Sequence, residues 1–317
     1  EGQGDRMLSF LPGVVRGVLA FVLVALNTVL WCIPLFALAL VKLALPFDAV
    51  RRRIDPMLNA IATLWVDGNG VWIALTQRAQ WDVQGAEDLR YADWYLVNCN
   101  HQTWVDILVL QRVLNRRIPL LKFFLKYELI YVPVIGLAWW ALDFPFMRRH
   151  SKAALRRNPG LREQDAETTR RACAKFALVP TSVMNFAEGT RFTVEKHRAQ
   201  GSPYRHLLKP KAGALALSLN AMGTQFHSLI DATIAYPDGA PTFWHFLCGH
   251  SPHVVVRLRR LPIPEEFCRA DYGTDSAFRR RFHHWLSDIW AEKDAQLAQL
   301  LGERADTGGE AGGLTPK

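Results

Sequence analysis

Cysteine is scarce in this chain, and the cysteines it has lie far apart. The five positions are Cys32, Cys99, Cys173, Cys248 and Cys268. Their number is odd and no two of them form a CxxC pair, so neither a disulfide framework nor a zinc knuckle is indicated. The simplest interpretation is a set of reduced thiols in a cytosolic compartment.

Several functional motifs are also missing. No G-x-S-x-G sequence occurs, which removes the usual signature of a serine nucleophile. The net charge of +9 favours an anionic partner: nucleic acid, phospholipid headgroups or a phosphorylated substrate. Because there is no helix-turn-helix, zinc finger or stacking platform, we predict no nucleic-acid partner. We also predict no metal site, since the spacing of His245, Cys248, His250 and His253 fits no standard tetrahedral set.

Charge is absent from Gly17 to Val41, a run of 25 residues. About 20 apolar residues cross a hydrocarbon core of about 30 Å, so the run is long enough for a spanning helix. Two alternatives stay open: a bent or hairpin element within one leaflet, because Pro34 could break the helix, and a cleaved signal peptide. More positive charge follows the run, at Lys42 and the arginines of 51–53, than precedes it. The positive-inside bias therefore places the bulk of the chain in the cytoplasm.

The rest of the chain divides by composition. We predict a membrane anchor at 1–47, a helical membrane-proximal linker at 48–79 that could lie along the bilayer surface, a folded domain at 80–301, and a Gly-rich disordered tail at 302–317. Within the folded domain, strand-like runs alternate with helical periodicity. This alternation predicts an α/β layer fold with a largely parallel sheet. The strand runs are 81–85, 94–99, 182–189, 229–236 and 253–261, and the helical runs are 104–114, 163–178, 211–221 and 276–301.

The string "NCNHQTWVDI" places His101 in a turn between a predicted strand and a predicted helix. Ligands gather at such turns, at the carboxyl edge of a sheet. Thr103 and Asp106 match a capping box, which explains Asp106 without any chemistry. The two interpretations are compatible, because a carboxylate in the first helical turn can also accept a hydrogen bond from one imidazole nitrogen. The other nitrogen could then take a proton from a substrate hydroxyl.

A second string, "VMNFAEGTRF", places Glu188, Gly189, Thr190 and Arg191 at the end of another predicted strand. Gly189 permits a tight turn and close backbone approach to a ligand, and Arg191 offers a two-pronged donor for phosphate. Taken alone, the string also fits an ordinary strand-ending turn with a solvated arginine.

Together, the two strings resemble the glycerolipid acyltransferase family of the 1-acylglycerol-3-phosphate acyltransferase (lysophosphatidate acyltransferase) type. Asn100, His101 and Asp106 match its first block, and the segment Phe186–Arg191 matches its third. The segments "ALDFPFMRR", with Phe146 and Arg149, and "IDATIAYP" resemble its second and fourth blocks. The connecting segment "LKYELIYVPVIG", which contains Lys126, is similar as well.

Three positions depart from the family pattern. Asp143 stands where many members have glycine, Ala187 replaces the commoner proline, and Asp231-Ala232-Thr233 replaces a proline-containing form of the fourth block. These departures bear on which lysolipid or acyl chain is preferred, and they leave His101 and Asp106 untouched.

The resemblance implies a mixed, largely parallel sheet flanked by helices and preceded by a membrane helix. It implies acyl transfer from acyl-CoA or acyl-carrier protein to the sn-2 hydroxyl of lysophosphatidic acid or a related lysophospholipid, within a membrane (the inner or plasma membrane in a bacterium). His101 would be the general base and Asp106 its partner, with no cofactor and no metal. Residues expected to bind substrate are Asn100, Lys126, Arg149, Glu188, Gly189, Thr190 and Arg191. A catalytically silent lipid-binding protein of the same fold is the alternative, and no oligomeric state is predicted.

Overall fold

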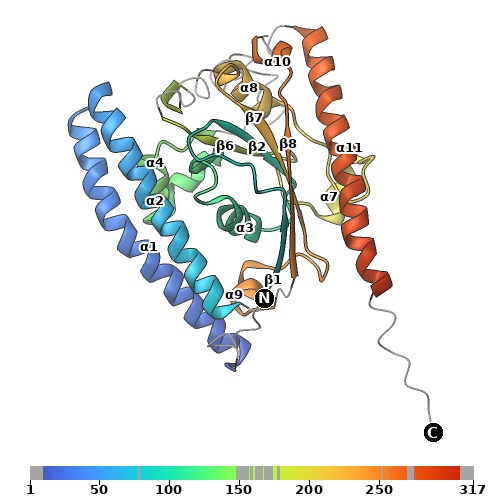
Figure 1. Ribbon diagram of the computed structural model, residues 1–317, viewed down its shortest axis with the longest axis horizontal. Helices are drawn as coiled ribbons and strands as arrows, with labels where there is room; N and C mark the ends of the chain where they lie inside the picture. The colour runs from blue at the N-terminus through green and yellow to red at the C-terminus, as the bar shows by residue number, and fades with distance from the viewer. Residues whose placement is uncertain are drawn as a thin grey trace.

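The computed structural model describes residues 10–77, 79–147, 157, 160, 167, 174–176, 179–250, 253–269 and 275–307. Arg149, most of the predicted helix at 163–178 and the end of the predicted tail lie outside these residues. The described chain forms three layers, with a central sheet covered by helices on both faces (Figure 1).

Six strands form the sheet in the order β1-β8-β7-β2-β6-β3. β8 runs antiparallel to β7, and the other neighbouring pairs are parallel. The predicted mixed, largely parallel sheet is therefore confirmed, and each predicted strand run contains a strand. The strands are β1 (Gln80–Gln84), β2 (Tyr95–Cys99), β3 (Leu121–Phe123), β6 (Ser182–Phe186), β7 (Ser228–Ala235) and β8 (His253–Leu261), and a separate parallel pair is β4 (Leu125–Lys126) with β5 (Phe146–Met147).

The central strand β2 is buried along its whole length, as expected for a strand covered on both faces. Tyr95, Val97 and Cys99 face a core built with α1–α4, whereas Leu96 faces a core built with α8, α10 and α11. On the first side lie α1 (Gly13–Ala44), α2 (Asp48–Thr76), α3 (Val105–Leu114), the 3-10 helix η1 (Tyr127–Tyr131) and α4 (Ile135–Ala141). The other helices are α7 (Val194–Gln200), α8 (Gly213–Met222), α9 (Phe243–Leu247), α10 (Glu265–Arg269) and α11 (Ser276–Thr307).

α1 and α2 form an antiparallel hairpin along one side of the molecule (Figure 1). α1 continues through Pro34, so the chain turns back at residues 45–47 and not at the proline. The segment predicted to be a helical linker forms α2, whose inner face, including Leu58 and Ile73, is buried against α1 and the core.

Asn27, the polar residue inside the apolar run, joins the two helices. Its Nδ2 donates to the backbone oxygen of Trp65 at 2.8 Å and to Oδ1 of Asn69 at 3.0 Å. Gly68 permits this approach, because a Cβ there would lie 2.1 Å from Oδ1 of Asn27. A polar side chain in an apolar helix is thus satisfied within the hairpin, which is the condition for burying it in lipid.

The turn of the hairpin is tied to the rest of the fold by buried charges. Nζ of Lys42 lies 2.7 Å from Oδ1 of Asp55 and also pairs with Asp143. Asp143 has a φ of 59°, a conformation that favours glycine, and its other oxygen lies 2.7 Å from Nζ of Lys175. The aspartate found where the resembled family often has glycine therefore keeps the glycine-like backbone and adds ion pairs with Lys42, Lys175 and Arg51.

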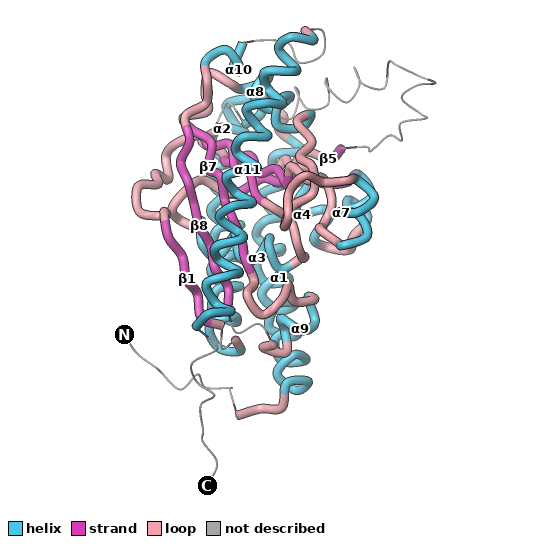
Figure 2. The backbone as a smooth tube through the Cα atoms, turned by 90° about the vertical axis from the view of Figure 1, so that its right-hand side faces the viewer, coloured by secondary structure: helices cyan, strands magenta, loops and turns pink. Residues whose placement is uncertain are grey.

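α11 is longer than its sequence pattern indicates. The predicted helix at 276–301 is present, but it continues to Thr307, six residues into the segment expected to be disordered. Figure 2 shows α11 lying across the strands β1, β7 and β8.

Candidate active site

The register of the sheet brings the two sequence motifs together. Cys99, the last residue of β2, pairs with Phe186, the last residue of β6. His101 and Glu188 each follow their strand by two residues, so both lie at the same carboxyl edge of the sheet, where ligands gather in α/β folds. The His101 side chain is 14% exposed, whereas that of Asp106 is 1% exposed.

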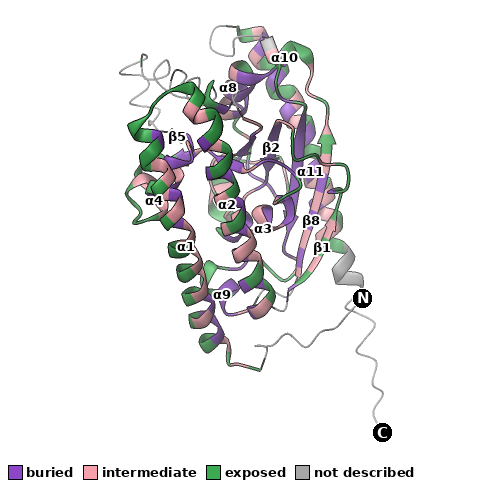
Figure 3. Cartoon of the chain, turned by 60° about the vertical axis from the view of Figure 1, so that its left-hand side comes forward, coloured by how far each residue is buried: buried purple, intermediate pink, exposed green. Residues whose placement is uncertain are grey.

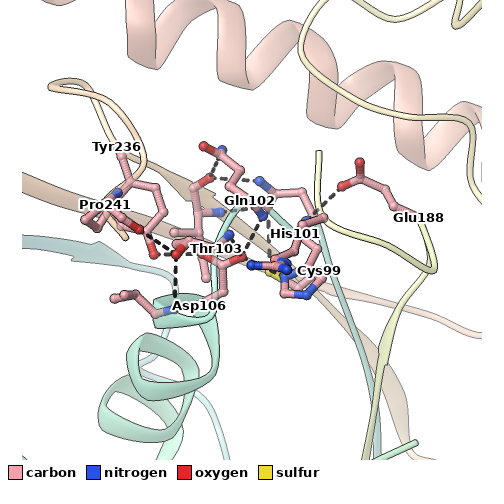
Figure 4. A network of polar contacts seen from close by, with 12 residues as sticks. Cys99, His101, Gln102, Thr103, Asp106, Glu188, Tyr236 and Pro241 are labelled. Carbon is pink, nitrogen blue, oxygen red and sulfur yellow. Dashed lines mark hydrogen bonds and ion pairs between the residues drawn. The ribbon is translucent and has the colours of Figure 1, made fainter. Parts of the chain in front are cut away.

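His101 and Asp106 form a hydrogen-bonded pair. Nδ1 of His101 lies 2.9 Å from Oδ2 of Asp106 (Figure 4). When Nδ1 carries the proton and donates it to the carboxylate, Nε2 presents a lone pair. Nε2 has no hydrogen-bond partner among the described residues, so the ring can accept a proton from an incoming group.

Asp106 is held by four donors. Its Oδ2 accepts from Nδ1 of His101, from the backbone of Gln102 at 2.6 Å and from the backbone of Thr103 at 3.0 Å. Its Oδ1 accepts from the hydroxyl of Tyr236 at 2.8 Å. A buried carboxylate with this many donors is fixed in position.

The predicted capping box is present only in part. Asp106 reaches back to the backbone N–H of Thr103, as the box requires. The Thr103 hydroxyl, however, donates to the backbone oxygen of Pro241 at 2.6 Å and makes only a 3.4 Å contact with the N–H of Val105. The threonine therefore fastens the start of α3 to the chain beyond β7.

Glu188 is fully buried and supports the histidine from the other side. Its Oε1 accepts from the backbone N–H of His101 at 2.8 Å, and its Oε2 accepts from the backbone N–H of Leu208 at 3.0 Å. Burial raises the pKa of Glu188 to about 7, against the lowering effect of these two amides. Both carboxylate oxygens of Glu188 are thus engaged by the backbone, and a contact between Glu188 and substrate stays a prediction.

Asn100 is buried as well, and it bonds to the backbone of β7. Its Nδ2 donates to the carbonyl of Ile234 and its Oδ1 accepts from the N–H of the same residue, both at 2.9 Å. Nε2 of Gln102 donates to the same carbonyl at 3.1 Å. Asn100 therefore holds the turn against β7, and its predicted contact with substrate stays a prediction.

The Gly189–Arg191 segment lies beside the pair on its exposed side. Gly189 has a φ of 67°, and a Cβ there would come within 3.0 Å of the Lys211 side chain. The hydroxyl of Thr190 accepts from Nζ of Lys196 at 2.9 Å. The exposed guanidinium of Arg191 lies 5.3 Å from the ring centroid of Trp104, the residue before α3.

Lys126 and Arg149 are the two other charged residues that were expected to bind substrate. Lys126 is exposed on β4, and no contact between it and His101 is found in the described part of the chain. Arg149 lies outside the described residues. Across those residues, no group of three or more His, Cys, Asp or Glu side chains is arranged to hold a metal ion.

A row of aromatic rings runs from His101 into the interior. The imidazole stacks on Phe186 with centroids 3.9 Å apart, Phe186 lies 6.3 Å from Phe123, and Phe123 lies 6.3 Å from Phe144. Phe144 lines an apolar cavity between the hairpin, α3 and α4. Other residues lining the cavity include Trp31, Leu35, Trp65, Trp139 and Leu142.

Tyr236 and Phe186 belong to the site, although neither is among the residues that the sequence predicts for it. Phe186 ends β6 and Tyr236 follows β7, so both stand at the same carboxyl edge as His101. The available signal was an aromatic residue at the end of a predicted strand. Which strands are neighbours depends on the tertiary structure, so the sequence alone could not place these rings beside His101.

Comparison with known proteins found a family model and several relatives. A family model described as Acyltransferase matches residues 80–236, which include His101, Asp106, the Glu188 segment and Tyr236. The chain is 29% identical over 214 residues to 1-acyl-sn-glycerol-3-phosphate acyltransferase delta of Homo sapiens, covering 63% of this chain and 51% of that protein. It is 25% identical over 200 residues to the gamma protein of the same species, covering 60% and 48%. The chain spans about half the length of the curated relatives it matches.

A solved structure shows a more remote likeness. The 1-acyl-sn-glycerophosphate (LPA) acyltransferase PlsC of Thermotoga maritima aligns with 88% of this chain and 96% of that chain, at 14% identity and a TM-score of 0.48. That value is too low to bear on function. The family model and the relatives identify residues 80–236 of this chain as an acyltransferase domain.

Proposed function

We propose that this protein is a membrane-bound acyltransferase that transfers a fatty acyl group from a thioester donor, acyl-CoA or acyl-carrier protein, to the sn-2 hydroxyl of lysophosphatidic acid or a related lysophospholipid. The observation that carries the proposal is the His101–Asp106 pair, with Nδ1 bound to the carboxylate and Nε2 left to accept a proton. The named activity of the relatives supports the acceptor class.

The proposed reaction is one direct displacement through a tetrahedral intermediate. Nε2 of His101 takes the proton of the acceptor hydroxyl while the hydroxyl oxygen forms a bond to the thioester carbonyl carbon. The C–S bond then breaks, and the departing thiolate receives the proton from the imidazolium. Asp106 keeps the ring in the required tautomer and stabilises its positive charge, as the carboxylate does in other His–Asp pairs. A thiolate leaves readily, so the reaction needs no covalent enzyme intermediate.

Arg191 is the proposed contact for the phosphate of the lysolipid, with Arg149 as its predicted second partner. The guanidinium is exposed and is held over Trp104 at the mouth of the site. Arginine binds phosphate through paired hydrogen bonds, and stacking on an aromatic ring pre-orients it. Gly189 lets the backbone come close to the same group.

The apolar cavity is the proposed seat of an acyl chain. Its lining is mostly apolar and aromatic, as in sites that hold apolar ligands, and the aromatic row connects it with His101. Trp139 forms part of its wall, whereas Trp140 is 47% exposed on the outer side of α4. The two tryptophans therefore have different proposed roles, Trp139 in the groove and Trp140 at the membrane interface.

The hairpin is the proposed membrane element. α1 is long and apolar enough to cross a bilayer, with a mean hydropathy of 2.4 over its most apolar window and only 17% of that window buried. Large apolar side chains on its outer face, such as Phe21, Leu26 and Leu30, are exposed (Figure 3). Because α1 and α2 are packed together, the hairpin either crosses the bilayer or lies within one leaflet, with the folded domain on the cytoplasmic side.

The proposal is tested by acyl transfer with purified protein in phospholipid vesicles, using lysophosphatidic acid and acyl-CoA or acyl-carrier protein. His101→Ala should lower kcat by about 10²–10⁴, since it removes the general base. Asp106→Asn should lower kcat by a similar factor, and Arg191→Ala should chiefly raise the KM for the lysolipid.

His253→Ala is the matched control, because Nδ1 of His253 also pairs with an aspartate, Asp238, at 2.8 Å. That variant should keep wild-type transfer. Near-normal transfer by His101→Ala would exclude the assigned base. Absence of donor-dependent product from the wild-type protein with every donor would instead indicate a silent lipid-binding protein.

A further inference from the structure

Tyr236 stands directly behind the His101–Asp106 pair. It follows β7 by one residue, is 3% exposed, and donates its hydroxyl hydrogen to Oδ1 of Asp106 at 2.8 Å (Figure 4). The proposed mechanism assigns it no role. A buried tyrosine hydroxyl needs a partner, but here the partner is the carboxylate that holds the candidate base.

We propose that Tyr236 is a positioning residue for the proton-accepting histidine, acting through Asp106. The proposal rests on the function proposed above. In this arrangement the tyrosine hydroxyl fixes the rotation of the carboxylate and draws part of its charge away from the imidazole.

The two oxygens of Asp106 have separate sets of donors. Oδ2 accepts from His101 and from two backbone amides, whereas Oδ1 accepts only from Tyr236 among the described residues. Without the tyrosine hydroxyl, Oδ1 would be buried with no donor, which costs more than the hydrogen bond itself is worth. The carboxylate could then turn, or it would bind the imidazole proton more strongly.

The same strand also holds the backbone around the histidine. Ile234, two residues before Tyr236, bonds through its backbone to the side chains of Asn100 and Gln102, the residues on either side of His101. Ile234, near the end of β7, therefore fixes the turn that contains His101. Tyr236, just after β7, fixes the carboxylate of Asp106.

Tyr236 stays a donor throughout the accessible pH range. Burial, together with the charge and hydrogen bond of Asp106, raises the pKa of Tyr236 well above its usual value. Other titratable groups near the pair are Cys99 on β2 and Glu188 after β6, with Lys293 of α11 and Asp231 of β7 on the opposite face of the sheet. Burial raises the pKa of Cys99 well above its usual value, so its thiol stays neutral.

Tyr236→Phe removes the hydroxyl and keeps the ring, so it is the decisive variant. We expect kcat to fall by about 10- to 100-fold, the range for loss of a hydrogen bond to a charged group, while the KM for both substrates stays within about twofold. Asp106 should then hold the imidazole proton more strongly, so the histidine is inactivated at higher pH. The acid limb of the pH profile of kcat/KM should therefore move upward by about one pH unit.

Tyr95→Phe is the matched control. Tyr95 is fully buried on β2, and its hydroxyl accepts from the backbone N–H of Arg90 outside the site. Its loss should leave the acid limb in place. Glu188 titrates in the wild type and in both variants, so its contribution cancels in the comparison.

A second readout does not require catalysis. In the proton NMR spectrum of the detergent-solubilised protein, the Nδ1 proton shared with Asp106 is identified by its loss in His101→Ala. That resonance should move further downfield in Tyr236→Phe and stay in place in Tyr95→Phe. An unmoved resonance together with an unmoved acid limb in Tyr236→Phe would overturn the proposal. If the wild type transfers no acyl group while the resonance still shifts, the proposed function fails and the positioning contact stands.

Discussion

The two faces of the sheet are covered by helices of opposite surface character. On one face the α1–α2 hairpin exposes large apolar side chains along its length, and these are the residues of a predicted membrane element (Figure 3). On the other face α11 exposes charged and polar side chains such as Arg280, His284 and Glu292. One side of the molecule is therefore suited to lipid and the other to water, and the His101–Asp106 pair lies at the edge of the sheet between them.

Both faces also contain buried charge, and each cluster ties a helical element to the core. On the hairpin side, Lys42 pairs with Asp55 and Asp143. On the α11 side, Nζ of Lys293 lies 2.9 Å from Oδ1 of Asp231, and Asp231 also pairs with Arg259. Buried pairs add little net stability over apolar contacts but are costly to break on one side only. They therefore hold each element in a single register.

The largest effect is expected from placing charge on the lipid-suited surface. Leu26 and Leu30 are 61% and 60% exposed near the middle of α1. Each arginine at a bilayer centre costs about 2.5–3.5 kcal/mol, so Leu26→Arg with Leu30→Arg should release most of the protein from vesicles in a flotation experiment. Ala291→Arg, on exposed α11, should float like the wild type. Flotation of the double variant at wild-type levels would contradict the membrane assignment of the hairpin.

A smaller but substantial effect is expected from breaking the charge cluster behind α11. Lys293 and Asp231 are both fully buried, so Lys293→Met leaves a buried carboxylate with only the partly exposed Arg259. Loss of one partner of a buried pair costs about 3–5 kcal/mol of unfolding free energy. Urea unfolding in detergent measures this loss. Arg281→Met breaks an exposed pair with Glu266 and should cost under about 1 kcal/mol of unfolding free energy. Equal losses of unfolding free energy in the two variants would show that the buried charge cluster does not hold α11 in place.

The smallest effect is expected at the wall of the apolar cavity. Trp139→Ala enlarges the space beside Phe144, so longer acyl donors should gain relative to shorter ones. A buried methylene is worth about 0.8 kcal/mol, and two additional carbons would change the ratio of kcat/KM between donors by about tenfold. Trp140→Ala removes an exposed ring from the same helix and should leave the ratio unchanged. Identical chain-length profiles in the two variants would place the acyl chain elsewhere.

Five of the six strands of the main sheet, all but the three-residue β3, and the candidate pair were accessible from sequence because each depends on local pattern. Runs such as 94–99 and 253–261 carry strand composition, and the step from strand to helix places His101 and Asp106 in one turn. The role of Glu188 was not accessible in the same way. Its partners are the backbone amides of His101 and Leu208. Almost every residue has a backbone N–H, so the residue types of these partners carry no sequence signal for the contact.

The bend of the hairpin shows the same limit. Pro34 is a reason for a helix to break, but α1 continues through it, because packing against α2 and the core outweighs the loss of one backbone hydrogen bond. Conversely, Asn27 is a polar residue in an apolar helix and Gly68 is a poor helix former. In the structure the Asn27 side chain lies against Gly68 and bonds to α2, so the two residues together join the helices.

By itself the sequence determined the alternation of strands and helices, the long uncharged run, and the His-x4-Asp and Glu-Gly-Thr-Arg strings, because periodicity, charge and short spacing are local properties. Only the tertiary structure decided that Glu188 and Tyr236 flank the pair and that an apolar cavity opens behind Phe144. Those neighbours come from strands and helices distant in the chain, and their meeting depends on strand order and helix packing.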